Sequence, residues 1–315
     1  MYFRDLLPSD ANRKELDGLC ADFSAFSQDC ISCMMQCFRA AEEVSRKTPE
    51  PHHATSLLLM RHAIESLDGV SVLLSKGCSQ PCQPLLRSAL EAALGIFYIL
   101  EADIKRRALA YQVAHAHKKI KLYERADPTT TAGTELRAVL KNDCCAEVLN
   151  DLPSMDYPKL IANLQSMLAE PDFQPIEQEW QSLKVKRKHD PEWFSLFGGP
   201  QSVRDLAIRV KWAGTYEFLY RTWSNEVHAG RAMESIGRRN SIIVMRPIRH
   251  PEELQQALLH ANNIALMVSR SILVAYAPDK LEWFKMNYIQ NIQKRATELR
   301  TKKIINAPWR DSEAF

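Results

Sequence analysis

The chain has 315 residues, of which 46% are apolar and 25% charged, and its net charge is +3 at pH 7. This composition excludes a mainly disordered chain, because it holds enough apolar side chains to build a core. The small net charge gives no argument for nucleic-acid binding, so such an argument has to rest on local patches.

Ten glycines are fewer than turn-rich β folds or Rossmann-type folds use, which favours an all-helical protein. Helical periodicity extends along most of the chain, and caps, glycines and prolines divide it into segments. We expect helices over 9–46, 53–76, 79–101, 103–126, 133–150, 156–169, 174–187, 215–229, 251–277 and 279–303, with a short one after Ser202. The segment 190–200 is expected to be a loop with aromatic anchors, and 241–245 is strand-like.

These segments predict one all-α domain, a multi-helix bundle in which long helices pair as antiparallel hairpins. Residues 128–200 hold shorter helices separated by prolines and are interpreted as a smaller helical insertion with a loop. Residues 304–315 are expected to form a loose tail.

Several features predict a reduced, cytoplasmic protein. Eight cysteines occur at irregular spacing, and the first residues lack the apolar segment of a secretory signal. Cys30 and Cys33 lie within a helical pattern, where small apolar core is the favoured interpretation. The most apolar stretch, 85–100, is interrupted by Arg87 and Glu91, so no membrane span is expected. Motifs of phosphate-binding loops and metal sites are missing, so no cofactor and no metal are predicted.

Arg87 and Glu91 are one turn apart in a segment that is apolar on most sides. Buried charges need partners, so this pair is expected to be at least half-buried and to have a defined role. One interpretation is a structural ion pair that ties two helices together. The other is the wall of a site, which positions a catalytic group or a phosphate.

A polar stripe is predicted in the segment 216–230, because hydrogen-bonding side chains recur there every four residues. Its members are Tyr216, Tyr220, Ser224 and His228. Arg221 precedes His228 by seven residues, nearly two turns, and Asn225 lies between them. Histidine exchanges protons near neutrality and arginine binds phosphate, which suits metal-free RNA cleavage by the ribose 2′-hydroxyl. The alternative is a histidine held by a neighbouring helix, with Glu91 as a candidate partner.

A cationic segment follows the stripe. Between 231 and 249 it holds a single acid, Glu234, and five arginines: Arg231, Arg238, Arg239, Arg246 and Arg249. Charge runs are usually solvated faces. This one directly follows His228, where a polyanion such as RNA would lie.

The motifs LRSALE at 86–91, FGGPQSVRDL at 197–206 and the stripe resemble, in order and spacing, a widespread bacterial family of unknown function. Its members share an RS-x-x-E helix and a Y-x3-Y-x3-S-x3-H helix, and the similarity covers about 55–235. That family is in turn similar to the HEPN superfamily, which includes ribonucleases of toxin–antitoxin, abortive-infection and CRISPR systems. HEPN ribonucleases use an R-x(4–6)-H motif that is usually assembled across a dimer.

The resemblance implies that Arg221 and His228, separated by six residues, are the catalytic pair. Thr222 stands where the HEPN pattern usually has Asn, Asp or His, and Asn225 is the candidate substitute. We therefore expect a homodimeric, metal-independent ribonuclease of a phage-defence or toxin system, with RNA and an antitoxin or defence protein as partners. Its supporting residues are Asn225, Ser224, Tyr220, Tyr216, Arg87 and Glu91, and its RNA-binding residues are Arg231, Arg238, Arg239 and Arg246.

Two other hypotheses come from the same residues. One is a non-catalytic helical binding or scaffold module, in which the Arg, Glu, Tyr, Ser and His side chains form a buried polar network. The other is a small-molecule enzyme that uses Glu91 as a base in an apolar pocket.

Overall fold

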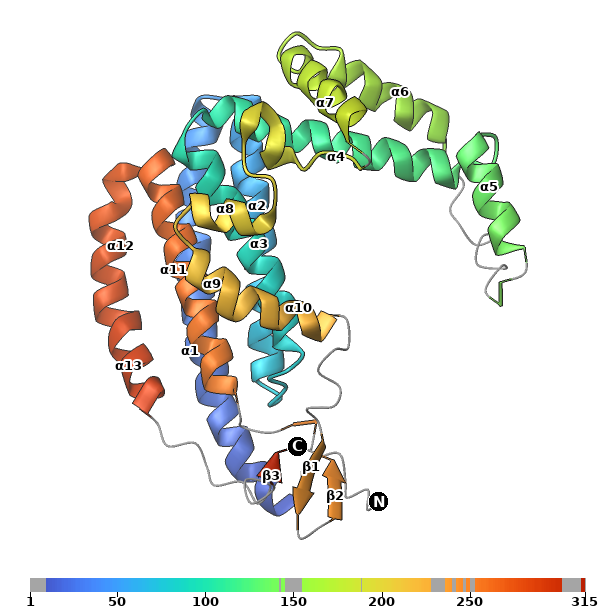
Figure 1. Cartoon of the computed structure of the whole chain (residues 1–315). Coiled ribbons are helices and arrows are strands. Elements are labelled where there is room, and N and C mark those ends of the chain that lie inside the picture. Colours follow the sequence, from blue (N-terminus) through green and yellow to red (C-terminus); the bar gives the residue numbers. More distant parts are fainter. Residues whose placement is uncertain are drawn as a thin grey trace. The chain divides into compact units, whose positions relative to one another are not determined.

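The computed structural model is predominantly helical, which confirms the all-α prediction (Figure 1). It describes residues 10–141, 143–144, 155–187, 189–227, 236–239, 242–245, 248–249, 253–301 and 313–314. The chain divides into two compact units, the first formed by Met1–Ala102 with Val203–Phe315 and the second by Asp103–Ser202.

The first unit contains most of the long helices. They are α1 (Asp10–Lys47), α2 (Pro51–Leu74), α3 (Cys82–Glu101) and α11 (Leu254–Tyr276). Its shorter helices are α8 (Val203–Arg209), α9 (Ala213–Thr215), α10 (Arg221–Val227), α12 (Leu281–Asn287) and α13 (Lys294–Thr301). The long helices begin and end within a few residues of the predicted boundaries. The final helix differs, because a π-helical segment, Tyr288–Gln293, separates α12 from α13.

The core of the first unit lies where α1, α2, α3 and α11 pack against one another (Figure 1). Helix α3 buries twelve of its 20 residues, because α2, α10 and α11 all pack against it. Helix α2 gives way to a turn in which Gly77 has a φ of 71°, a conformation that glycine adopts without strain. This turn returns the chain antiparallel into α3.

Helix α11 is the one helix, among the residues that the structure places, whose length and composition would let it cross a membrane. Within its most apolar window, 56% of the residues are buried inside the protein. Val268, Ile272 and Leu273 are fully enclosed. Helix α11 is therefore a core helix, and its burial against other helices explains why it is apolar.

The cysteines of α1 are part of the core, as predicted. Cys20, Cys30, Cys33 and Cys37 are all buried. The Cys30 thiol contacts Asn262 of α11, with 3.1 Å between Sγ and Oδ1. Burial raises the pKa of the Cys30 thiol to about 12, so this sulfur stays protonated and packs as a small apolar group.

Three short strands accompany the helices. They are β1 (Ile236–Arg239), β2 (Ile242–Met245) and β3 (Glu313–Ala314), in the antiparallel order β2-β1-β3. The predicted strand-like run corresponds to β2, which pairs Ile242 with Arg239. In the predicted loose tail, Glu313 pairs with Arg238 and Ala314 with Gly237, and the other residues from 304 to 315 lie outside the described part of the chain.

The second unit consists of α4 (Ile104–Ala126), α5 (Thr131–Leu140), α6 (Tyr157–Leu168) and α7 (Gln174–Lys186). Its core is centred on Trp180, which is fully buried and stacks on His117 with ring centroids 4.9 Å apart. The unit begins at Asp103, whereas the predicted insertion begins at 128. The difference arises because α4 contributes Val113 and Ala116 to this core.

The segment 190–200 is anchored to the second unit by its aromatic and apolar side chains, in line with the expected loop. It contains a short 3-10 segment, Trp193–Gly198, in which Phe194 and Leu196 are buried. Trp193 also packs edge-to-face on Tyr111 of α4, with ring centroids 5.4 Å apart. These contacts make the segment part of the packed unit.

We predict that Gly133→Ala destabilises the protein by about 2 kcal/mol, because the new Cβ would overlap the carbonyl oxygen of Asp127. The matched control is Gly18→Ala in α1, where nothing lies within 4 Å of the added carbon. Alanine favours a helix over glycine by about 1 kcal/mol, so this control should stabilise. Thermal denaturation of both variants checks the pair. Equal effects on unfolding would contradict the proposed overlap at Gly133.

Candidate functional site

A three-residue polar network joins α3 to the segment that leads into α10. Arg87 Nη2 donates a hydrogen bond of 2.9 Å to the hydroxyl of Tyr220, which donates one of 2.7 Å to Glu91 Oε1. Arg87 and Glu91 also form an ion pair with each other at 3.1 Å. The Arg87 guanidinium lies 4.8 Å from the centroid of the Tyr220 ring. The network therefore combines charge, hydrogen bonding and a cation–π contact.

The network is half-buried. Tyr220 is 7% exposed, while the side chains of Arg87 and Glu91 are 24% and 45% exposed. The sequence predicted a half-buried pair here, and the apolar residues around Arg87 and Glu91 explain it. Leu86, Ala89 and Leu90 of α3 pack into the core and hold the pair at its edge.

A π-helical turn, Tyr216–Tyr220, sets the direction of these side chains. The backbone N–H of Arg221 donates to the carbonyl of Tyr216, five residues earlier, in place of the four-residue spacing of an α-helix. Within this turn the rings of Tyr216 and Tyr220 stack, with centroids 4.9 Å apart and an interplanar angle of 19°. The uninterrupted helix predicted over 215–229 missed this turn.

The environment of Tyr220 keeps its phenol protonated. Burial is the largest cause, and the hydrogen bond to Glu91 adds to it, so the pKa of Tyr220 rises to about 12. A proton on the hydroxyl is what allows Tyr220 to donate to Glu91 while it accepts from Arg87. The phenol acts here as a bridge between two charges.

The outward side of the same turn carries a second ionic cluster. Arg221 pairs with Glu217 at 3.0 Å, and Glu217 also accepts from Arg204 of α8 at 2.8 Å. Hydrogen bonds from Arg204 and Arg221 lower the pKa of Glu217. The Arg221 side chain is 67% exposed. Tyr220 therefore faces the core and Arg221 faces solvent.

Helix α10 has a second anchor on the core. Trp223 is 4% exposed and meets His260 of α11 edge-to-face, with ring centroids 5.7 Å apart. Burial lowers the pKa of His260, which favours the neutral ring in this contact. Tyr220 and Trp223 together fix the side of α10 that faces the protein.

The remaining predicted site residues are placed only in part. Ser224 is half-buried on α10, and Asn225 lies on the same helix, although its side chain is outside the described residues. Arg238 and Arg239 are on β1, again without described side chains. His228, Arg231 and Arg246 lie outside the described part of the chain. The predicted pairing of Arg221 with His228 stays a prediction.

Sequence reasoning missed two contacts at this site. Ser88 of α3 forms a hydrogen bond of 2.8 Å with His62 Nε2 of α2, so every polar residue of the RS-x-x-E motif has a partner. The Arg204–Glu217–Arg221 cluster was also missed. The spacing of Glu217 and Arg221 was visible in the sequence, but the approach of α8 was not.

The described ranges contain no group of three or more His, Cys, Asp or Glu side chains that could hold a metal ion. The side chains that the structure does bring together, Arg87, Glu91 and Tyr220, supply charge and hydrogen bonds. They are suited to holding helices in register and to binding polar or anionic groups.

Taken with the fold, these contacts define an all-helical protein with a polar Arg–Tyr–Glu junction between α3 and α10. The sequence model of a family of unknown function, DUF5677, matches residues 53–241, and the chain belongs to this family. The matched range contains the junction and both Arg221 and His228. No curated protein and no solved structure matches the chain.

We predict that Tyr220→Phe lowers the free energy of unfolding by about 1 to 2 kcal/mol, because it removes the hydroxyl that bridges Arg87 and Glu91. Tyr216→Phe is the matched control, since both variants retain stacked rings and only Tyr220 uses its hydroxyl in the network. Chemical denaturation measures both. A loss of equal size in the two variants would contradict the bridging role.

The raised pKa of Tyr220 also predicts a pH dependence. A group whose pKa is higher in the folded state stabilises the fold below its unfolded pKa and loses that contribution as pH rises. For Tyr220 the loss falls between about pH 10, the ordinary value for tyrosine, and about pH 12. We expect wild-type stability to decline more steeply across this window than that of Tyr220→Phe. If the free energy of unfolding declines equally with pH in the two proteins, the fold does not raise the pKa of the Tyr220 phenol.

Proposed function

We propose that the chain is a metal-independent ribonuclease in which Arg221 and His228 act on RNA. The observation that carries the proposal is the anchoring of α10. Tyr220 and Trp223 hold one side of the helix against the core, and Arg221 extends from the other side into solvent. This arrangement supports a role for Arg221 in binding a large anionic ligand.

The ion pair of Arg221 is compatible with that role. Glu217 is shared between Arg204 and Arg221, so an incoming phosphate that takes Arg221 leaves Glu217 paired with Arg204. Arginine binds phosphate oxygens in a bidentate manner, and a contact of this kind is stronger than a neutral hydrogen bond. When a phosphate replaces Glu217 as the partner of Arg221, both Arg221 and Glu217 therefore remain paired.

An exposed aromatic residue lies in the same turn. The side chain of Phe218 is 79% exposed and belongs to the turn that carries Glu217 and precedes Arg221. Single-stranded RNA is commonly bound by aromatic rings on which bases stack, next to cations that hold the phosphates. Phe218 with Arg204 and Arg221 supplies both kinds of group.

The chemistry that we propose balances without a metal. The imidazole of His228 takes the proton of a ribose 2′-hydroxyl, whose oxygen attacks the adjacent phosphorus and displaces the 5′-oxygen. The imidazolium of His228 returns this proton, directly or through water, to the leaving 5′-oxygen, and a 2′,3′-cyclic phosphate remains. Arg221 stabilises the negative charge on the phosphorane. The supporting positions are Tyr216, Tyr220, Ser224 and Asn225 on the same segment, with Arg87 and Glu91 behind it.

The resemblance to HEPN proteins extends the proposal to assembly and context. We infer a cytoplasmic homodimer that completes its site across the dimer interface. We place it in a phage-defence or toxin system, where an antitoxin or a second defence protein controls it. The cationic segment with Arg231, Arg238, Arg239 and Arg246 would then follow the RNA backbone.

A second candidate function, a non-catalytic helical module, is favoured by a specific observation. The Tyr220 hydroxyl both accepts from Arg87 and donates to Glu91, so its hydrogen-bonding capacity is used inside the protein. A network of this kind can serve to fix α10 on α3. The two functions differ in what they require of His228 and Arg221.

We expect His228→Ala and Arg221→Ala each to lower cleavage of single-stranded RNA at least about 100-fold, the contribution of a general base or an oxyanion-stabilising group. Cleavage should persist in excess chelator. Arg61→Ala is the matched control, because Arg61 is similarly exposed and pairs with Glu65 four residues away, as Arg221 does with Glu217. Gel analysis of a labelled oligoribonucleotide measures the rates.

Circular dichroism should show that all three variants remain folded. Activity that survives both substitutions, or that appears only with added metal, would overturn the ribonuclease proposal. If the folded wild type shows no cleavage of any RNA, the helical module becomes the better assignment.

A further inference from the structure

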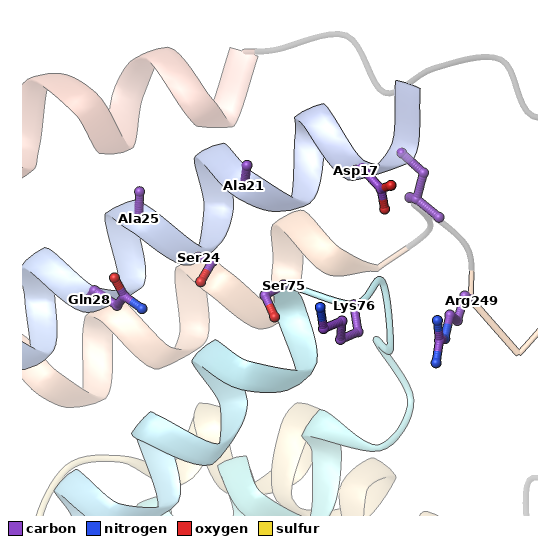
Figure 2. Close-up of a pocket in the computed structure, with 9 residues that line it drawn as sticks. Asp17, Ala21, Ser24, Ala25, Gln28, Ser75, Lys76 and Arg249 are labelled. Carbon is purple, nitrogen blue, oxygen red and sulfur yellow. The ribbon is translucent and has the colours of Figure 1, made fainter. Parts of the chain in front are cut away.

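A groove in the first unit, formed mainly by α1 and the turn after α2, is lined by residues of three segments. Figure 2 shows it beside α1, at the end of α2 and next to Arg249. Its volume is about 690 Å³, within the usual range for small-molecule sites. The lining residues are Leu16, Asp17, Ala21, Ser24, Ala25, Gln28, Ser75, Lys76 and Arg249.

Charged side chains gather at one end of this groove. Lys76, Arg249 and Asp17 lie there on facing segments (Figure 2). Within the described part of the chain, none of the three belongs to an ion pair, whereas all three arginines of α8 and α10 do. The two cations and the carboxylate form no ion pair with one another. They are therefore suited to a ligand that carries both an anionic group and a hydrogen-bond donor.

The other end of the groove offers neutral polar groups. Ser24 and Gln28 lie on α1, one turn apart, and the small residues Ala21 and Ala25 leave the helix surface open between them and Asp17. Eleven residues separate Asp17 from Gln28, which corresponds to about 16 Å along a helix. An elongated ligand with a charged head and a polar body would use the whole length.

Lys76, one of the two cations, lies in a hydrogen-bonded turn. Beyond α2, Ser75 Oγ donates to the carbonyl of Val72 at 2.7 Å, and the Lys76 N–H donates to the carbonyl of Leu73 at 3.0 Å. Gly77, with its positive φ, then reverses the chain. Lys76 therefore projects from a fixed turn, and less conformational entropy is lost when it binds an anion.

We propose that this groove binds a small phosphate monoester with a hydroxylated or amide-bearing body. Lys76 and Arg249 would hold the phosphate, because an ammonium and a guanidinium together match a doubly charged group. Asp17 would accept from a hydroxyl of the ligand, while Ser24 and Gln28 would bind its far end. This function is separate from RNA cleavage and does not depend on it.

The test uses isothermal titration calorimetry of the full chain with adenosine monophosphate, ribose 5-phosphate, inorganic phosphate and adenosine. We expect the two organic phosphates to bind, inorganic phosphate to bind more weakly, and adenosine not to bind. Lys76→Gln and Arg249→Gln should each weaken binding about tenfold or more, as loss of one charge-assisted contact does. The matched control is Lys47→Gln at the end of α1, an exposed lysine outside the groove.

Thermal denaturation identifies any variant that fails to fold, and Lys76→Arg, which keeps the charge, should retain binding. Several results would overturn the proposal: no heat from any phosphate probe, adenosine binding as tightly as its phosphate, or equal loss in the Lys47 control. A fall in oligoribonucleotide binding by the groove variants, without binding of the monoesters, would assign the groove to RNA instead. RNA cleavage by Lys76→Gln, which changes a residue outside the cationic segment 231–249, should remain at the wild-type level, so failure here leaves the ribonuclease proposal intact.

Discussion

A pair of opposite charges within an otherwise apolar helix needs partners at its own position, and the way the α10 segment meets α3 depends on this constraint. In α3 the pair is Arg87 and Glu91, and a phenol from 129 residues further along the chain completes it. Two charges and one hydroxyl have complementary capacities, so each of the three groups has partners at the edge of the core, and only Arg87 Nε is buried without one. The same contact decides where α10 lies on α3.

One turn of the chain therefore has two chemically different sides. The side with Tyr220 is closed by core contacts, while the side with Phe218 and Arg221 is open to solvent. The π turn separates these sides, because its extra residue changes the angular relation between positions before and after it. Segments of this kind are frequent at functional sites, since they place side chains at angles that a regular helix does not offer.

Sequence reasoning went furthest where local rules suffice. Caps, prolines and glycines located the long helices, and the leucines around Arg87 and Glu91 indicated a half-buried pair. The π turn was not predicted, because the four-residue spacing of Tyr216 and Tyr220 fits an α-helix equally well. The hydrogen bond between Tyr220 and Glu91 is a long-range contact that spacing does not encode. The boundary at Asp103 depends likewise on the packing of α4 around Trp180.

The division of the chain also has a consequence during synthesis on the ribosome. The second unit is continuous, so it can fold as soon as it emerges. The first unit is split around it: α1 packs against α2, which follows directly, and against α11, which begins at Leu254. At a translation rate of about 5 to 20 residues per second, the side of α1 that packs on α11 waits on the order of ten seconds or more for that helix. A nascent chain of this design presents α1 to cellular chaperones for that interval.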